Sequence, residues 1–330
     1  MPENLEQAPA ETESDRAGFR LAAFAAVVVV VLFAGYGIGR LNNSVEQAKA
    51  APVATGDGHG DHAAGSAPPH NDAGAAPHQH HADGTVTQVA GAGMNAESVG
   101  GLAVTVAGMT LAPETNSWKA GQSRPYRFRI TAAGGAPVTT FAVVHDKPLH
   151  FVVVRRDLTG FQHLHPTMAP DGTWSIDLAL AAPGSYRAIA DFTAVVGGQQ
   201  TPATLGVDLT VAGDYRPVAL PAPVPQATTD GFTISSVGAP QTGAVQPLLM
   251  TVTGPDGKPA RLEPHLGAFG HLVVLREGDV GYVHVHPEPQ PVDGAVKFWL
   301  AAPGPGRYRM FFDFKVAGKV HTATFTATVG

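Results

Sequence analysis

The sequence predicts a mainly β protein in which two tandem immunoglobulin-like β-sandwich domains follow an N-terminal transmembrane helix and a disordered, His-rich linker. From residue 96 onward, strand-length apolar runs alternate with turn signals such as APDGT, AAPGS and GPDGK, a pattern typical of sandwiches and barrels. The second half of this region repeats the first. One uncharged apolar run stands near the N-terminus, ahead of a segment poor in large apolar side chains.

The apolar run LAAFAAVVVVVLFAGYGIG at 21–39 contains no charged residue and is bracketed by Arg20 and Arg40. At 1.5 Å per residue it is about 28 Å long, close to the thickness of a bilayer's hydrocarbon core. A buried helix of a soluble protein would show a polar face, and this run shows none. We therefore predict a transmembrane helix at 21–39, preceded by a cytoplasmic segment at 1–20.

The segment between Lys49 and Lys119 contains no Lys or Arg, which favours the translocated side of the membrane. We predict a single-pass plasma-membrane protein with its N-terminus in the cytoplasm and the bulk of the chain outside it. The alternative is a protein secreted after cleavage near Ala50, because Ala48-Lys49-Ala50 fits a signal-peptidase site. The acidic N-terminal stretch is unusual for a signal peptide, so the uncleaved anchor is favoured.

Residues 40–95 consist mainly of Ala, Gly, Pro, His and Asp, a composition that cannot bury enough apolar surface to offset the entropy of ordering. We predict a disordered linker. Its histidines suit the capture of copper or zinc ions, since neutral imidazole is a good ligand for both. Alternatively, they are tolerated polar residues of a spacer. The candidate capture residues are His59, His62, His70, His78, His80 and His81.

The internal repeat is extensive. HFVVVRRDLTGFQHLHP at 150–166 aligns without gaps to HLVVLREGDVGYVHVHP at 271–287, and the motifs LAAPG, Tyr-Arg and Asp-Phe recur later in the same order. We predict one β-sandwich domain at 96–213 and its repeat at 230–330. The Pro-rich stretch between them, at 214–229, is expected to be a semi-rigid linker.

Tyr186 and Tyr308 each follow a Pro-Gly near the start of a predicted strand. This placement resembles the tyrosine corner of immunoglobulin-like sandwiches. We expect both tyrosines to have a structural role, in which they pin the chain where it crosses between the sheets.

In the first domain, HFVVVRR and GFQHLHP are predicted to form a hairpin closed by a four-residue loop. Side chains alternate along a strand, so His163 and His165 project from one face. With this loop His163 pairs with Val154, and His150 lies on the same face, diagonal to His165. His145, from the preceding loop, is placed to close over the cluster. The equivalent candidates in the second domain are His265, His271, His284 and His286.

Each quartet is a candidate site for Cu²⁺ or Zn²⁺, which accept nitrogen ligands. Met168 lies three residues after His165 and is a candidate soft ligand for copper. Asp191 and Asp313 recur in strands that can lie beneath the clusters, as ligands or as acceptors that orient an imidazole N–H. The alternative is structural: Phe161 and Tyr282 share the histidine face, so that face is also compatible with packing into a core.

The stretch HFVVVRRDLTGFQHLHP, followed by APDG and then by APGSYRAIADF, resembles bacterial exported, membrane-anchored proteins loosely described as heavy-metal-associated. The resemblance covers both domains, and the second departs from it where Gly278-Asp279 replaces Asp157-Leu158. The architecture is also similar to the small immunoglobulin-like sandwiches of copper handling, the YtkA-like and copper-resistance periplasmic families. These resemblances imply periplasmic or cell-surface binding of copper.

Several classes of function are disfavoured. The net charge of −6 gives no electrostatic basis for binding nucleic acid. The absence of cysteine excludes disulfides, thiolate metal sites and cysteine nucleophiles, and no G-x-S-x-G motif supports a hydrolase, so we expect no enzyme. We predict a membrane-tethered, extracytoplasmic metal-binding protein, with copper ion favoured and zinc ion as the alternative. Capture, delivery or resistance, and transfer to another envelope or metal-transport protein, are compatible roles. The competing hypothesis is a structural or interaction module of the cell envelope.

Overall fold

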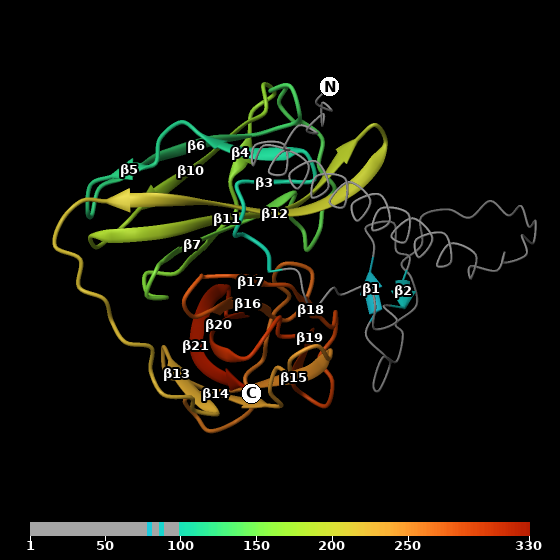
Figure 1. The fold of residues 1–330 in the computed structure, drawn as a ribbon. Helices are drawn as coiled ribbons and strands as arrows, with labels where there is room; N and C mark the ends of the chain where they lie inside the picture. The colour runs from blue at the N-terminus through green and yellow to red at the C-terminus, as the bar shows by residue number, and fades with distance from the viewer. Residues whose placement is uncertain (1–77, 81–85, 89–98) are drawn as a thin grey trace, which may run out of the picture. The chain divides into compact units, whose positions relative to one another are not determined.

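Figure 1 shows the computed structural model, which describes residues 78–80, 86–88 and 99–330. These residues form strands and turns and contain no helix, so the mainly β prediction is confirmed for them. Within this part of the chain, accordingly, no helix has the length and apolar character needed to cross a membrane. The transmembrane helix predicted at 21–39 lies outside the described residues.

Two short strands occur within the predicted linker. β1 (His78–His80) and β2 (Val86–Gln88) pair antiparallel, with His80 opposite Val86. The prediction of disorder over the whole of 40–95 is therefore wrong for these strands. The connecting sequence contains Asp83-Gly84, a strong hairpin-turn signal, and Val and Thr favour strands.

The first domain is a sandwich of two five-stranded sheets (Figure 1, blue-green to yellow). One sheet has the order β3 (Thr105–Val106), β4 (Met109–Pro113), β6 (Ser123–Thr131), β10 (Thr173–Ala179), β9 (Thr167–Met168). The other has the order β5 (Ser117–Trp118), β12 (Gln199–Val211), β11 (Gly184–Val196), β7 (Leu149–Arg155), β8 (Gln162–Leu164). The core between them contains Phe128, Phe151 and Trp174, each at most 1% exposed.

The second domain repeats this arrangement (Figure 1, orange to red). One sheet has the order β13 (Gln226–Thr229), β14 (Phe232–Val237), β15 (Gln246–Thr253), β19 (Val296–Leu300), β18 (Val285–Pro287). The other has the order β17 (Tyr282–Val283), β16 (His271–Arg276), β20 (Gly306–Val316), β21 (Lys319–Val329). Because β13 pairs with β14, the second domain begins at Gln226, earlier than predicted. The last proline of the linker is Pro225, so the following residues are free to form ladder bonds.

Each domain has the predicted tyrosine corner. The Tyr186 hydroxyl donates a hydrogen bond to the Ala182 carbonyl at 2.9 Å, and the Tyr308 hydroxyl donates one to the Gly304 carbonyl at 2.6 Å. Both rings are buried. Each bond therefore ties the entry of a long strand to the turn four residues before it.

Replacing Tyr308 with phenylalanine is expected to lower the free energy of unfolding by about 1–2 kcal/mol, because the buried Gly304 carbonyl loses its partner while the ring's packing is kept. Urea denaturation measures this difference. The matched control is Tyr215→Phe, at a 40% exposed position, where no comparable loss is expected. Equal stability of the Tyr308→Phe variant and the parent would contradict a structural role for the corner bond.

Strand β7 is buried along its whole length. Phe151 and Val153 point into the core of the first sandwich, whereas Val152 and Val154, on the opposite face, belong to a separate apolar cluster. That cluster also contains Val273 and Phe311 of the second domain. The second face of β7 is therefore covered by the repeat.

The two domains are joined through this apolar cluster and belong to one compact unit of the chain. Phe161 of the first domain stacks on Phe311 of the second, with ring centroids 3.8 Å apart and planes 4° from parallel. Backbone bonds between Gly100 and Tyr282, each 3.0 Å long, extend the contact. The face that bears the predicted histidine ligands is thus a domain interface.

The predicted hairpin register is wrong by two residues. His163 pairs with Val152 rather than Val154, because the connection at 156–161 is longer than the predicted loop. The backbone of Leu158 is left-handed (φ 62°), and the Arg155 N–H donates a hydrogen bond to the Thr159 carbonyl. Both features widen this turn. A shift of two residues keeps every side chain on its predicted face, since strand side chains alternate with a period of two.

Candidate metal centre at the domain interface

Three histidine side chains meet at one end of the domain interface. His150 is the second residue of β7, His163 is in β8, and His271 opens β16 of the second domain. Each residue offers one ring nitrogen, and these three nitrogen atoms all lie within 4.8 Å of one another. The cluster therefore draws on both domains.

The surroundings of His150 select its tautomer. Its Nε2 lies 3.1 Å from the Val144 carbonyl oxygen. A carbonyl only accepts, so Nε2 carries the proton and Nδ1 presents a lone pair to the cluster. Burial, followed by the charge of His163, lowers the pKa of His150 to about 4, which keeps the ring neutral near pH 7.

His163 is oriented by a carboxylate of the other domain. Its Nδ1 lies 2.9 Å from Asp313 Oδ2, and both side chains are 5% exposed. The N–H is therefore on Nδ1, and in the neutral ring Nε2 has a lone pair. Asp313 is itself held by the Thr322 hydroxyl, which donates to Oδ1 at 2.5 Å. A carboxylate behind a ligating imidazole is a common arrangement in metal sites.

The His150 Nδ1 and His163 Nε2 atoms are 3.2 Å apart. With the tautomers set by Val144 and Asp313, two lone pairs face each other unless a proton or a metal ion lies between them. Ligand nitrogens of a tetrahedral zinc ion, bound at 2.0–2.1 Å, are separated by about 3.3 Å. The observed spacing fits nitrogens that share one cation.

His271 supplies a further buried ring nitrogen. The residue is 6% exposed, and its Nδ1 has no hydrogen-bond partner among the described residues. Its ring stacks on His150 at 5.1 Å between centroids and lies 4.7 Å from the ring of His163. Burial, and then the neighbouring histidines, lower the pKa of His271 well below its ordinary value. The ring is therefore neutral, the form that binds metals.

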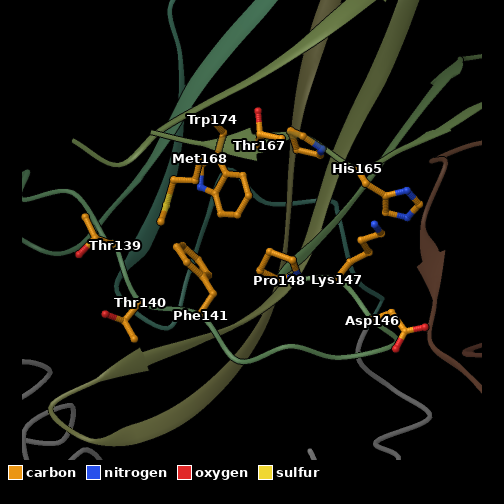
Figure 2. A pocket seen from close by; sticks show the side chains of 11 residues that line it. Thr139, Thr140, Phe141, Asp146, Lys147, Pro148, His165, Thr167, Met168 and Trp174 are labelled. Carbon is orange, nitrogen blue, oxygen red and sulfur yellow. The ribbon is translucent and has the colours of Figure 1, made fainter. Parts of the chain in front are cut away.

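His165 adds a fourth nitrogen at the edge of the cluster. Its Nε2 is 3.3 Å from His150 Nδ1, and burial followed by the charge of His163 lowers its pKa to about 3. The ring also lines a surface pocket, where Figure 2 shows it beside Lys147. His165 thus lies between the buried nitrogens and the pocket.

The two predicted quartets do not form two separate sites. His271 joins the first-domain histidines, and His145 lies near both groups, with its ring centroid 5.9 Å from that of His150 and 5.8 Å from that of His271. The rings of His284 and His286 are 4.5 Å apart on the second domain. His265 is half-buried, and its pKa is lowered by burial and affected by Asp313 and His163.

Met168 does not point into the cluster. The chain leaves β8 after Leu164 and enters the opposite sheet at β9, where Met168 is paired with Trp174 and packs against the core of the first sandwich. Figure 2 shows the Met168 sulfur directed toward Phe141, away from His165. The prediction that Met168 contributes a thioether ligand here is wrong, because the strand changes sheets between the two residues.

The two repeated aspartates have different partners. Asp313 orients His163, as predicted for an acceptor behind an imidazole. Asp191 instead accepts hydrogen bonds from the Thr204 hydroxyl at 2.7 Å and the Tyr282 hydroxyl at 3.4 Å. The position aligned with Tyr282 is Phe161, which has no hydroxyl. The sequence shows this difference between the repeats. Because the Tyr282 hydroxyl binds Asp191, whereas Phe161 has no hydroxyl to bind Asp313, Asp313 is the aspartate that a histidine contacts.

The linker histidines are described only in part. His78 and His80 lie on β1, and the other four, His59, His62, His70 and His81, lie outside the described residues. Their proposed role in metal capture is therefore a prediction from the sequence.

A family model matches both domains, over residues 104–212 and again over residues 227–330. Its description is "Domain of unknown function (DUF8832)". The chain belongs to this family. Because one model matches twice, the predicted internal repeat is confirmed as two DUF8832 domains. No curated protein sequence is similar enough to the chain to count as a match.

Solved structures similar to the two DUF8832 domains include the Escherichia coli adhesin FdeC, with 16% identity over 69% of this chain and 66% of that chain and a TM-score of 0.24. A Salmonella alpha-2-macroglobulin is 11% identical over 70% of this chain and 15% of its own, with a TM-score of 0.24. Invasin, a bacterial integrin-binding protein, is 15% identical over 66% of this chain and 39% of its own, with a TM-score of 0.19. The matches cover less than two thirds of these structures' own chains. TM-scores this low establish neither a shared fold nor a shared function.

Proposed function

We propose that the protein is a membrane-tethered, extracytoplasmic metal-binding protein whose high-affinity site is the histidine cluster at the domain interface. The observation that carries this proposal is the buried Nδ1 of His271, which no described residue hydrogen-bonds, beside the 3.2 Å approach of His150 Nδ1 and His163 Nε2. Burying an unpaired polar atom costs about 1–3 kcal/mol. A bound cation offsets that cost by giving each lone pair a partner.

Copper is the proposed ion, with zinc as the alternative. The donors are neutral imidazole nitrogens, which suit Cu²⁺ and Zn²⁺, and nitrogen sites generally bind Cu²⁺ more tightly than Zn²⁺. Asp313 would orient His163 and increase its basicity, while the apolar cluster beside the site excludes water from one side. Competition between the two ions at equal free concentration distinguishes them.

The His-rich linker is proposed to capture ions and to hold them near the folded site. On one chain the two elements share a high effective concentration, which favours transfer over release. Capture, delivery to another envelope or metal-transport protein, and resistance are all compatible with this arrangement. The tyrosine corners support the immunoglobulin-like description of both domains.

The test uses the full chain in detergent with the six linker histidines replaced by glutamine, here called the linker-substituted protein. Equilibrium dialysis with Cu²⁺ is expected to show one tightly bound ion per chain. His163→Ala is expected to weaken binding by more than roughly 100-fold, and Asp313→Asn by roughly 10- to 100-fold, because the second change removes only the group that orients the ligand.

The control is His321→Asn, at a buried histidine of the second domain that contacts Asp230 at 2.7 Å. Asparagine can keep a donor toward Asp230, so its metal affinity should equal that of the linker-substituted protein. Lack of saturable Cu²⁺ and Zn²⁺ binding, or unchanged affinity after His163→Ala, would overturn the proposed function.

A second candidate is a structural or interaction module of the cell envelope. The observation in its favour is the apolar packing beside the histidines, with Phe161 stacked on Phe311. In that case the histidines help the domains to pack, and their loss lowers stability without any metal-dependent effect.

A further inference from the structure

His284 and His286 form an outward-facing pair on the second domain. Their neighbours Val283 and Val285 are 4% and 8% exposed and belong to the core of the second sandwich. His284, between β17 and β18, is exposed, and His286 is half-buried. Their ring centroids are 4.5 Å apart. The buried valines thus anchor two adjacent imidazoles that water and ions can reach.

His145 lies beside the buried cluster. It occupies a two-residue turn closed by reciprocal backbone bonds between Val144 and Lys147, of 2.9 and 3.1 Å. His145 and Asp146 both have left-handed backbones (φ 49° and 60°), as the centre of such a turn requires. The Val144 carbonyl also accepts the N–H of His150. The turn therefore holds the ring of His145 beside the cluster, 5.9 Å from the ring of His150 and 5.8 Å from that of His271 between centroids.

The position of this turn is braced by the second domain. Gly267 lies in the turn between His265 and Ala268. A side-chain carbon added to Gly267 would lie 3.5 Å from the Cα of His145, so this turn contacts the turn that contains His145. Burial lowers the pKa of His145 to about 4, and the next largest effect comes from His284. His145 is, by its ring distances, next to His150 and His271. His284 follows Val283, which pairs with Val274 of β16, the strand that His271 opens.

The buried triad needs a path for ions. His150, His271 and the side chain of His163 are only 5–6% exposed. The pocket beside His165 is one approach, but Asp146 and Lys147 line it with opposite charges (Figure 2), so together they offer a metal ion no net attraction. The side of His284 and His286 presents imidazoles at the surface instead.

We propose that His284 and His286 form a second, exchangeable metal site, from which ions pass beside His145 to enter and leave the buried centre. This inference rests on the proposed function. The pair would bind the hydrated ion weakly, His145 would replace a water ligand as the ion moves inward, and the nitrogens of the buried triad would replace the rest. No bond other than metal–ligand bonds forms or breaks, and the oxidation state is unchanged.

The experiment follows Co²⁺ binding to the linker-substituted full chain, by the visible absorption of Co²⁺ bound to nitrogen ligands. Two equivalents are expected, one tight and one weak. In the double variant His284→Ala/His286→Ala, the weak equivalent should be lost and the tight site should fill at least roughly tenfold more slowly, with its equilibrium affinity unchanged. Because His284 is exposed, the urea midpoint of the single variant His284→Ala should match that of its parent.

Lys147→Ala is the matched control on the pocket side. It is expected to leave the loading rate unchanged, whereas faster loading would place the entry route at the pocket and overturn the inference. Two equivalents filled at the parental rate by the double variant would overturn it as well. A different result would overturn the proposed function itself: the linker-substituted protein would bind no equivalent of Co²⁺ tightly.

Discussion

Replacing His271 with leucine is expected to abolish tight metal binding and to leave the metal-free protein at least as stable as the parent. The buried Nδ1 of His271 has no hydrogen-bond partner among the described residues, so its removal relieves a cost of about 1–3 kcal/mol. Leucine has a similar volume and suits an interface lined by valines. Loss of one of three ligands is expected to weaken Cu²⁺ binding by more than roughly 100-fold.

The measurements are equilibrium dialysis and urea denaturation of the linker-substituted protein, with and without Cu²⁺. His321→Leu is the matched control: His321 is 7% exposed, but its Nδ1 contacts Asp230 at 2.7 Å. This control should lose about 1–3 kcal/mol of stability and keep its metal affinity. If His271→Leu instead destabilises the protein and leaves metal binding unchanged, the histidines are packing residues and the structural alternative holds.

Acidification is expected to destabilise the metal-free protein between pH 6.5 and about pH 4. Burial lowers the pKa of His145 and of His150 to about 4 in the folded state, whereas both are near 6.5 in the unfolded chain. Between these values the unfolded chain binds protons that the folded protein does not, so the free energy of unfolding falls as pH falls. The contribution is complete above pH 6.5 and is lost below about pH 4; for His145 alone it is on the order of 3 kcal/mol.

Urea denaturation at a series of pH values measures this loss. The double variant His145→Asn/His150→Asn should show a flatter dependence over the same window. Two carboxylates do not contribute in this pH window. Burial raises the pKa of Asp157 and of Asp279, but hydrogen bonds with Arg155 and Arg276 outweigh it and lower both pKa values. Their effect on the free energy of unfolding therefore lies below pH 3.8. A parental stability that is constant from pH 7 to pH 4.5 would contradict the burial of neutral imidazoles.

Bound metal is expected to shift this transition to lower pH, because the ion and protons compete for the same lone pairs. At a free concentration 100 times the dissociation constant, the ion adds about 2.7 kcal/mol to the free energy of unfolding. The metal-dependent part of the stability should therefore disappear in the His271→Leu variant.

Much of the fold was predictable from local pattern. Strand-length apolar runs, Pro-Gly turns and the repeated segment at 271–287 were enough to predict two β domains, because side-chain alternation and turn chemistry act over a few residues. The common face of His163 and His165 was predictable for the same reason. It survived an error in register, since a shift of two residues preserves the face.

The tertiary structure alone decided what that face meets. From the sequence, the histidine face was compatible with a metal site or with packing into a core, and no local pattern identified the surface that covers it. The cover is the other domain, so His271 and Asp313 join His150 and His163 in one site rather than in two. Such contacts arise from packing between residues more than 100 positions apart, and no periodicity within a strand encodes them. Local alternation determined where each histidine points, and long-range packing determined its partners.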